Sequence, residues 1–240
     1  MSQELTYKKI YDSIDADSEK IRIKIDMLYT KVIKEFRKEI VFPSVRWYEY
    51  DIPTSKNRYI LFFWTTGKDN KPSGDFFCIF QDGQQQFFLR CLRGGYQHTN
   101  NRPLEYVPQV HAYTTHFFER YRERFLKRAN MNIIDVACHY FYRNRTEIPI
   151  KVDEQINRNI NEYGPNSMIG FRVNDGFCFT MSDLDANIYP SGNSELDEIE
   201  SWAFVYTTFV DKELLSQEQK EAIDYEHNRV VSRFNGFAEE

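Results

Sequence analysis

The stretch that decides the fold is RYILFFWTTGKDNKPSGDFFCIFQDGQQQFFLRCL, residues 58–92. Three apolar and aromatic runs, 58–66, 75–81 and 85–92, are separated by turn residues, and Asp82-Gly83 stands between the last two. An Asp-Gly pair between alternating apolar runs favours a tight β-hairpin. Because no helical pattern separates the runs, we expect neighbouring strands to pair antiparallel, as in a meander.

The same pattern extends the meander in both directions. VRWYEYDI precedes it at 45–52 and EYVPQVHAYT follows it at 105–114, so we expect antiparallel strands across residues 45–114. Residues 1–44 are predicted to be helical, because apolar residues recur there at steps of three and four and share one stripe. These residues are Ile21, Ile25, Leu28, Val32, Phe36 and Ile40. Pro43 ends this segment, since proline cannot continue a helix.

Residues 115–240 combine helical patterns with a second set of strands. The elements predicted there are helices over 115–128 and 132–143, a polar helix over 151–161, a hairpin of 168–173 with 177–181, a polar and acidic connection over 183–200, a last strand over 201–210 and a helix over 213–234. The sequence therefore predicts a single α+β domain over residues 1–240. Its mainly antiparallel sheet packs against helices, and a helix lies at each end of the chain.

The composition is that of a folded protein without a general affinity for nucleic acid. The chain of 240 residues is 41% hydrophobic, with 20 Phe and 16 Tyr, which is enough to fill a core. Its net charge of −5 lacks the basic excess of most nucleic-acid-binding proteins. The charge is uneven, because residues 102–146 hold 8 Lys and Arg against 4 Asp and Glu, whereas residues 147–240 hold 7 against 19. The acidic segment either covers the basic one or is solvated surface.

The cysteines point to a reducing compartment. Cys78, Cys91, Cys138 and Cys178 form no Cys-x-x-Cys pair and stand among apolar neighbours, which favours reduced cysteines in a core. The chain begins without an apolar run, and no apolar run along it approaches the ~20 residues needed to span a bilayer. We therefore expect a cytoplasmic protein that does not enter a membrane.

Metal and cofactor chemistry find little support in the sequence. His98, His111, His116 and His139 lie within one region, but their spacing matches no zinc motif. The chain also contains no G-x-S-x-G nucleophile motif. We therefore predict neither a metal nor a cofactor.

The candidate functional residues lie in THFFERYRERF, residues 115–125. On a helix its aromatic residues fall within an arc of about 100°, which suits a stripe that faces the core. His116, Arg120 and Arg124 are spaced four residues apart and form one row on the other side. This row faces either water or a groove.

Two chemical features favour a groove that binds phosphate. The histidine stands at the expected start of the helix, where backbone N–H groups and the helix dipole favour an anion. Each arginine in the row can form a forked contact with a phosphate, and histidine exchanges protons near neutral pH. The alternative is a solvated face on which Glu119 and Glu123 pair with the arginines.

A longer pattern resembles the barnase–EndoU–colicin–RelE group of RNase toxin domains. A strand leads into Thr115, His116, Arg120 and Arg124 on a helix, followed by a second helix, a hairpin and a last strand rich in Thr. The later pieces are NIIDVACHYFY (132–142), FRVNDGFCFT (171–180) and AFVYTTFV (203–210). The resemblance covers about residues 110–210, which is under half of the chain.

The resemblance implies metal-independent RNA cleavage, in which the 2′-hydroxyl attacks the adjacent phosphate. His116 would serve as general base or acid, and Arg120 and Arg124 would hold the phosphate, with Thr208 completing the catalytic set. Tyr113, Tyr206 and Thr207 would add hydroxyl groups that bind the substrate. In strict strand alternation Tyr206 and Thr208 share one face and Thr207 the other, so the three cannot all serve.

The resemblance also implies RNA as a partner and, for a toxin, an inhibitory protein. A second hypothesis belongs to a different class. In it the chain is a non-catalytic module that binds protein or nucleic acid through the same surface or through none. The position of the His116 row relative to the hydroxyl groups of the last strand separates the two hypotheses.

Overall fold

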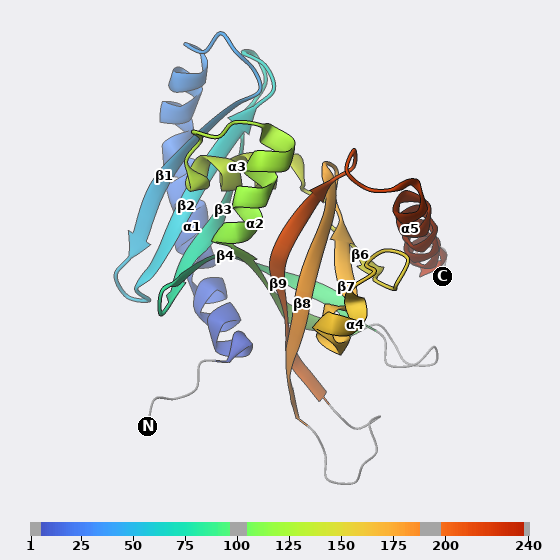
Figure 1. The fold of residues 1–240 in the computed structure, drawn as a ribbon. Coiled ribbons are helices and arrows are strands. Elements are labelled where there is room, and N and C mark those ends of the chain that lie inside the picture. The colour runs from blue at the N-terminus through green and yellow to red at the C-terminus, as the bar shows by residue number, and fades with distance from the viewer. Residues whose placement is uncertain (1–5, 97–104, 188–197, 238–240) are drawn as a thin grey trace. The chain divides into compact units, whose positions relative to one another are not determined.

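The computed structural model describes residues 6–96, 105–187 and 198–237 (Figure 1). The α+β class is confirmed, with helices near both ends of the chain and nine strands. Hydrogen-bonded neighbours run in the order β1-β2-β3-β4-β5-β9-β8-β7-β6. Contacts divide the chain into two compact units, unit 1 (residues 1–112 and 184–203) and unit 2 (residues 113–183 and 204–240). The single domain drawn from the sequence stays a prediction.

Unit 1 contains the N-terminal helix and the meander. Its elements are α1 (Tyr7–Phe36), β1 (Ser44–Ile52), β2 (Asn57–Thr65), β3 (Ser73–Asp82), β4 (Gln85–Tyr96) and most of β5 (Glu105–Thr114). The strands β1 to β4 pair antiparallel with their sequence neighbours, in the predicted order. The tight turn is at Asp82-Gly83, where Gly83 has a φ of +57°, a conformation that glycine adopts without strain. The predicted meander is confirmed for β1 to β4, and β5 is the next strand in the sheet.

Helix α1 packs on this sheet through the predicted stripe, with one exception. Thr6 caps the helix by accepting a hydrogen bond from the backbone N–H of Lys9, and Val32 and Phe36 are buried. The helix ends at Phe36, so Ile40 lies beyond it and is 93% exposed. The prediction that Ile40 belongs to the stripe was wrong, because the helical period stops before that residue.

Unit 2 contains the helix pair and the second set of strands. Its elements are α2 (Thr115–Tyr121), η1 (Arg122–Leu126, a π-helical turn), α3 (Ile133–Arg143), β6 (Ile148–Lys151), α4 (Ile160–Tyr163), η2 (Pro165–Ser167), β7 (Ile169–Arg172), β8 (Gly176–Asn187), β9 (Glu198–Asp211) and α5 (Gln217–Phe237). The strands β6, β7 and β8 pair antiparallel. The ends of β8 and β9 that join residues 188–197, which are not described, belong to unit 1.

Helices cover both faces of the unit 2 strands (Figure 1). On one face, Tyr206 and Phe209 of β9 contact the ring of Phe117 in α2. On the other face, Phe177 of β8 packs in one apolar cluster with Ile223 of α5. None of the helices within the described ranges is both long and apolar enough to cross a membrane.

Two polar segments of unit 2 differ from their predicted structure. Of the helix predicted over 151–161, only residues 160–161 are helical, as the start of α4. Before them the Asp153 carboxylate accepts hydrogen bonds from the backbone N–H groups of Gln155 and Ile156 and closes a turn. The connection predicted over 183–200 is shorter, because β8 extends to Asn187 and β9 begins at Glu198. The rest of that connection, residues 188–197, lies outside the described residues.

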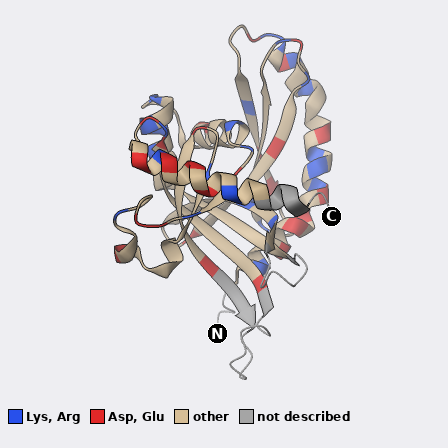
Figure 2. Cartoon of the chain, turned by 90° about the vertical axis from the view of Figure 1, so that its right-hand side faces the viewer, with Lys and Arg blue, Asp and Glu red and all other residues tan. Residues whose placement is uncertain are grey.

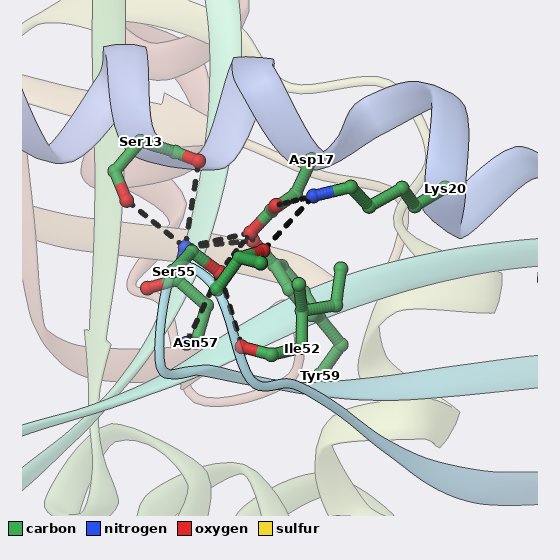
Figure 3. Close-up of polar contacts among 8 residues, drawn as sticks. Ser13, Asp17, Lys20, Ile52, Ser55, Asn57 and Tyr59 are labelled. Carbon is green, nitrogen blue, oxygen red and sulfur yellow. Dashed lines mark hydrogen bonds and ion pairs between the residues drawn. The ribbon is translucent and has the colours of Figure 1, made fainter.

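A buried carboxylate joins α1 to the turn between β1 and β2 (Figure 3). Asp17, which is 2% exposed, accepts hydrogen bonds from Ser55 Oγ, from Asn57 Nδ2 at 3.0 Å and from the Tyr59 hydroxyl at 2.9 Å. The Lys20 ammonium lies 3.5 Å from the second carboxylate oxygen. Burial alone would raise the pKa of Asp17, but these donors outweigh it and lower the pKa below the usual 3.8.

We predict that Asp17→Asn destabilises the fold by about 2–3 kcal/mol at pH 7, because a neutral amide replaces the acceptor of several buried donors. The folded pKa is lowered, so the carboxylate contributes stability above pH 4 or so and loses it as the pH falls through the folded value. Urea unfolding followed by circular dichroism should show the gap between wild type and variant narrowing below pH 4. A gap of constant size down to pH 2 would contradict this role for Asp17.

Candidate functional site

The end of β5 positions the first turn of α2 against β9. The Thr114 side chain accepts a hydrogen bond from the backbone N–H of Phe117 at 3.0 Å, which caps α2. The same hydroxyl donates to the backbone carbonyl of Tyr206 at 3.0 Å. Phe117 and Phe118 are buried, as the predicted aromatic stripe requires. His116, on the other side, is left exposed next to β9, with 55% of its side chain accessible.

His116 lines a cleft of about 410 Å³ together with residues of β8, β9 and the segment that carries α4. The lining residues are His116, Asn157, Tyr163, Ser167, Phe179, Thr180, Met181, Thr207 and Thr208. The wall thus combines one imidazole and four aliphatic hydroxyl groups with an apolar surface. Three of the predicted site residues, His116, Thr207 and Thr208, meet in this cleft.

Both threonines of β9 reach the cleft because the strand departs from strict alternation. Tyr206 and Phe209 are three residues apart, yet both contact Phe117 on the α2 face. Side chains three apart on a regular strand would point to opposite faces. The two residues between them therefore share the other face, as in a β-bulge. The predicted conflict between Thr207 and Thr208 does not arise, because both line the cleft.

The hydroxyl groups of the cleft are not equivalent. Thr180, Thr207 and Ser167 each donate to a backbone carbonyl, at 2.6, 3.1 and 2.7 Å. Their oxygens remain able to accept hydrogen bonds from a ligand, but their protons are committed. Thr208 has no hydrogen-bond partner among the described residues, so its hydroxyl is able to donate to a ligand as well.

The contacts of His116 favour one tautomer of the imidazole. Arg120 Nε donates to His116 Nε2 at 3.4 Å, so Nε2 acts as an acceptor. His116 Nδ1 lies 3.7 Å from a carboxylate oxygen of Glu119, which suits a proton on Nδ1. In this arrangement Nε2 is the nitrogen without a proton, and its lone pair faces the Arg120 N–H.

The two predicted arginines do not line the cleft. Arg120 pairs with Glu123 at 3.0 Å, and Arg124 Nη1 donates to the backbone carbonyl of Phe209 at 2.5 Å. Burial, and then the charge of Arg120, lower the pKa of Arg124. The row predicted from a four-residue step is interrupted because the α-helix ends at Tyr121 and Arg124 lies in the π-helical turn, whose period is longer.

The structure removes Tyr113 and Tyr206 from the predicted substrate-binding set, because both side chains are fully buried. Their rings stack with centroids 4.0 Å apart. Their hydroxyl groups donate to Glu147 at 2.6 and 2.7 Å, and the Tyr140 hydroxyl donates to the same carboxylate at 3.1 Å. Burial, and then nearby charges that include Glu147, raise the pKa of Tyr206 and Tyr140 well above the usual value. These phenols belong to the core and not to the cleft.

A second carboxylate in unit 2 was missed by sequence reasoning. Asp175, in the turn between β7 and β8, is 4% exposed and accepts hydrogen bonds from Tyr121 at 2.6 Å and Asn144 at 3.0 Å. The Arg143 guanidinium contacts both of its oxygens at 2.8 Å. The Asn-Asp-Gly triplet at 174–176 predicted the turn, but nothing in it indicated that the aspartate points inward.

The described part of the chain has no cluster of metal ligands, and two of the cysteines of unit 2 are buried. Residues 6–96, 105–187 and 198–237 contain no group of three or more His, Cys, Asp or Glu able to hold a metal ion. His98, one of the histidines weighed from the sequence, lies outside these ranges. Cys138 and Cys178 are fully buried, and burial raises the pKa of both thiols.

Comparison of the chain with protein-family models, curated proteins and solved structures finds no match. The resemblance to RNase toxin domains therefore stays a prediction from the residues named above.

We predict that Tyr113→Phe and Tyr206→Phe each lower the free energy of unfolding by about 1.5 kcal/mol, because each removes one hydrogen bond to a carboxylate. Each variant keeps its aromatic ring and therefore the stacking of residues 113 and 206, so neither change should affect ligand binding or catalysis in the cleft that His116 lines. Urea unfolding checks the first effect and the RNA assay described below checks the second. If a folded variant lost activity, the substituted tyrosine would have a role in substrate binding after all.

Proposed function

We propose that unit 2 cleaves RNA without a metal ion, with His116 as the general base. The observation that carries this proposal is the convergence of His116, Thr207 and Thr208 in one cleft. An imidazole beside hydroxyl groups is the minimum that 2′-hydroxyl attack requires, namely a proton acceptor and donors for the phosphoryl oxygens. The cleft, with a volume of about 410 Å³, has room for a nucleotide-sized ligand.

The proposed reaction is an internal phosphoryl transfer. His116 Nε2 takes the proton of the 2′-hydroxyl, the 2′-oxygen bonds to phosphorus, and the bond from phosphorus to the 5′-oxygen breaks. The 5′-oxygen leaves with a proton from water, and the products carry a 2′,3′-cyclic phosphate and a 5′-hydroxyl. Glu119 faces Nδ1 and stabilises the imidazolium that forms.

The charge on the transferring phosphoryl group needs a cation and a hydrogen-bond donor. Arg120 is the nearest cation, since its Nε lies 3.4 Å from His116 Nε2. Its pair with Glu123 is on the surface, with both side chains well exposed, so a bound phosphate displaces it at little cost. The Thr208 hydroxyl supplies the donor. Arg124 has no part in this proposal, because its guanidinium is held by the carbonyl of Phe209.

The apolar part of the wall suits a nucleobase. Tyr163 is 55% exposed and lines the cleft beside the half-buried Phe179. Aromatic rings at such a position stack on bases with little sequence preference. An inhibitory protein, the partner expected for a toxin-type ribonuclease, would block the reaction by covering this cleft.

The second candidate is a non-catalytic binding module, and a specific observation favours it. Glu119 and Glu123 lie against His116 and Arg120, as they would on a solvated charged face. In this hypothesis the cleft binds its ligand through the same side chains, but no proton transfer follows. The two candidates differ in one outcome, which is whether RNA that binds is also cut.

We predict that purified protein cleaves total RNA in the presence of EDTA and that His116→Ala lowers the rate by at least about 100-fold, the usual contribution of a general base. Gel electrophoresis measures the rate, and end analysis should find 2′,3′-cyclic phosphates. Lys127→Ala is the matched control, because it removes an exposed cation just beyond the same helical segment and should keep the wild-type rate.

Two results would overturn the ribonuclease proposal. If wild-type protein binds RNA in a filter assay but leaves it intact, the binding module is the better description. If His116→Ala cuts RNA as fast as wild type, the histidine has no catalytic role. The melting temperatures of both variants should match that of wild type, because His116 is exposed and its contacts are surface pairs.

A further inference from the structure

A second cleft of unit 2, about 400 Å³ in volume, is lined by basic residues. Its cationic side chains come from the end of α3, the loop after it, β7 and the residue that follows β9, and a histidine comes from α5. They are Arg143, Arg145, Arg172, Lys212 and His227. Thr146 and Asn174 add polar groups, and no Asp or Glu is among the described residues of the lining.

Arg143 is held in place by buried residues. Both oxygens of Asp175 accept from Arg143 at 2.8 Å, and Asp175 is itself fixed by Tyr121 and Asn144. The Arg143 guanidinium also lies over the ring of Phe125, with 4.8 Å to the ring centroid. Its side chain is still 31% exposed, so it meets the cleft in a fixed orientation. A cation oriented in advance loses little entropy when an anion binds.

The carboxylates near the cleft are engaged with cations. Asp224 of α5 pairs with Arg172 at 2.9 Å. Elsewhere on α5, Glu218 pairs with Arg158 at 3.5 Å and Glu226 pairs with Arg229 at 2.6 Å. Helix α5 crosses the front of Figure 2 and carries red and blue segments along its length. Three of its acidic residues thus neutralise particular cations, and Glu221 accepts a hydrogen bond from Gln217.

Two exposed cations complete the wall. Arg145 and Lys212 are both exposed residues, and both line the cleft. Arg143 and Arg172 already face Asp175 and Asp224, so an anion in the cleft would be attracted mainly by the charges of Arg145 and Lys212. Arginine forks match the oxygens of a phosphate, and lysine adds a point charge.

We propose that this basic cleft binds the phosphate group of a nucleotide or of a nucleic-acid strand. The site does not depend on His116 or on catalysis, and it therefore stands apart from the proposed ribonuclease activity. Lys212 follows Thr208 by four residues, a separation of roughly 13 Å along β9. One strand of RNA can thus reach both clefts only if it extends beyond a single nucleotide.

The test compares two variants that lose the same charge. Arg145→Gln with Lys212→Gln removes the exposed cations of the cleft. Lys151→Gln with Arg158→Gln removes one lysine and one arginine that are exposed elsewhere in unit 2. Calorimetric titration measures binding of AMP, of adenosine and of a DNA oligonucleotide that lacks terminal phosphates. DNA has no 2′-hydroxyl, so the proposed cleavage cannot interfere.

The proposal expects saturable binding of AMP or the oligonucleotide by wild type, no binding of adenosine, and at least a tenfold loss of affinity in the cleft variant only. Preference for AMP would identify a terminal phosphate as the ligand, and preference for the oligonucleotide would identify the backbone. Equal weakening of both double variants, or no saturable binding by wild type, would overturn the proposal. The readout is binding of ligands that cannot be cleaved, so a failure here would leave the ribonuclease proposal standing, and a failure of the ribonuclease assay would leave this proposal standing. If the cleft variant fails to fold, Arg145→Gln alone replaces it.

Discussion

The geometry of unit 2 depends on one carboxylate that accepts hydrogen bonds from three tyrosines. Glu147, just before β6, binds the hydroxyl groups of Tyr113 at the end of β5, Tyr140 in α3 and Tyr206 in β9. Three phenols buried without an acceptor would each cost free energy, so Glu147 satisfies them together. Glu147 therefore links α3, the end of β5, the start of β6 and β9 at a single fixed point.

That fixed point explains why two threonines of β9 can face the cleft. Tyr206 is held toward the aromatic core by Glu147 and by stacking on Tyr113. Phe209 is held there by its contacts with Phe117 and Tyr121. Two anchors three residues apart on the same face force the residues between them to the other face. A strand with regular alternation would bury one threonine and expose the other. The candidate site is thus a by-product of how the core is packed.

Local patterns predicted the elements well, because each rests on a short repeat. The strands of unit 1, the hairpin at 174–176 and the helix α3 follow from periodicity and turn chemistry within about ten residues. The position of His116 beside β9 was foreseen in part, since Thr207 and Thr208 were expected near it. The predictions that failed concern side chains whose partners are distant in the sequence. Arg124 binds the carbonyl of Phe209, which is 85 residues away in sequence. Helical periodicity shows which side of a helix a residue lies on, but it does not show which distant residue packs against that side.

Counting charges along the sequence has the same limit, because the count does not show which charges are paired in the fold. Residues 147–240 hold 19 Asp and Glu against 7 Lys and Arg, which suggests a surface that repels phosphate. Yet Asp175 is buried against Arg143, and Asp224 pairs with Arg172, so each of these acids is balanced by one cation of the basic cleft. An anion responds to the charges it approaches within about 10 Å, the screening length in salt, and not to the net charge of the segment. An acidic chain is therefore compatible with a binding site for phosphate, provided that its carboxylates already have partners.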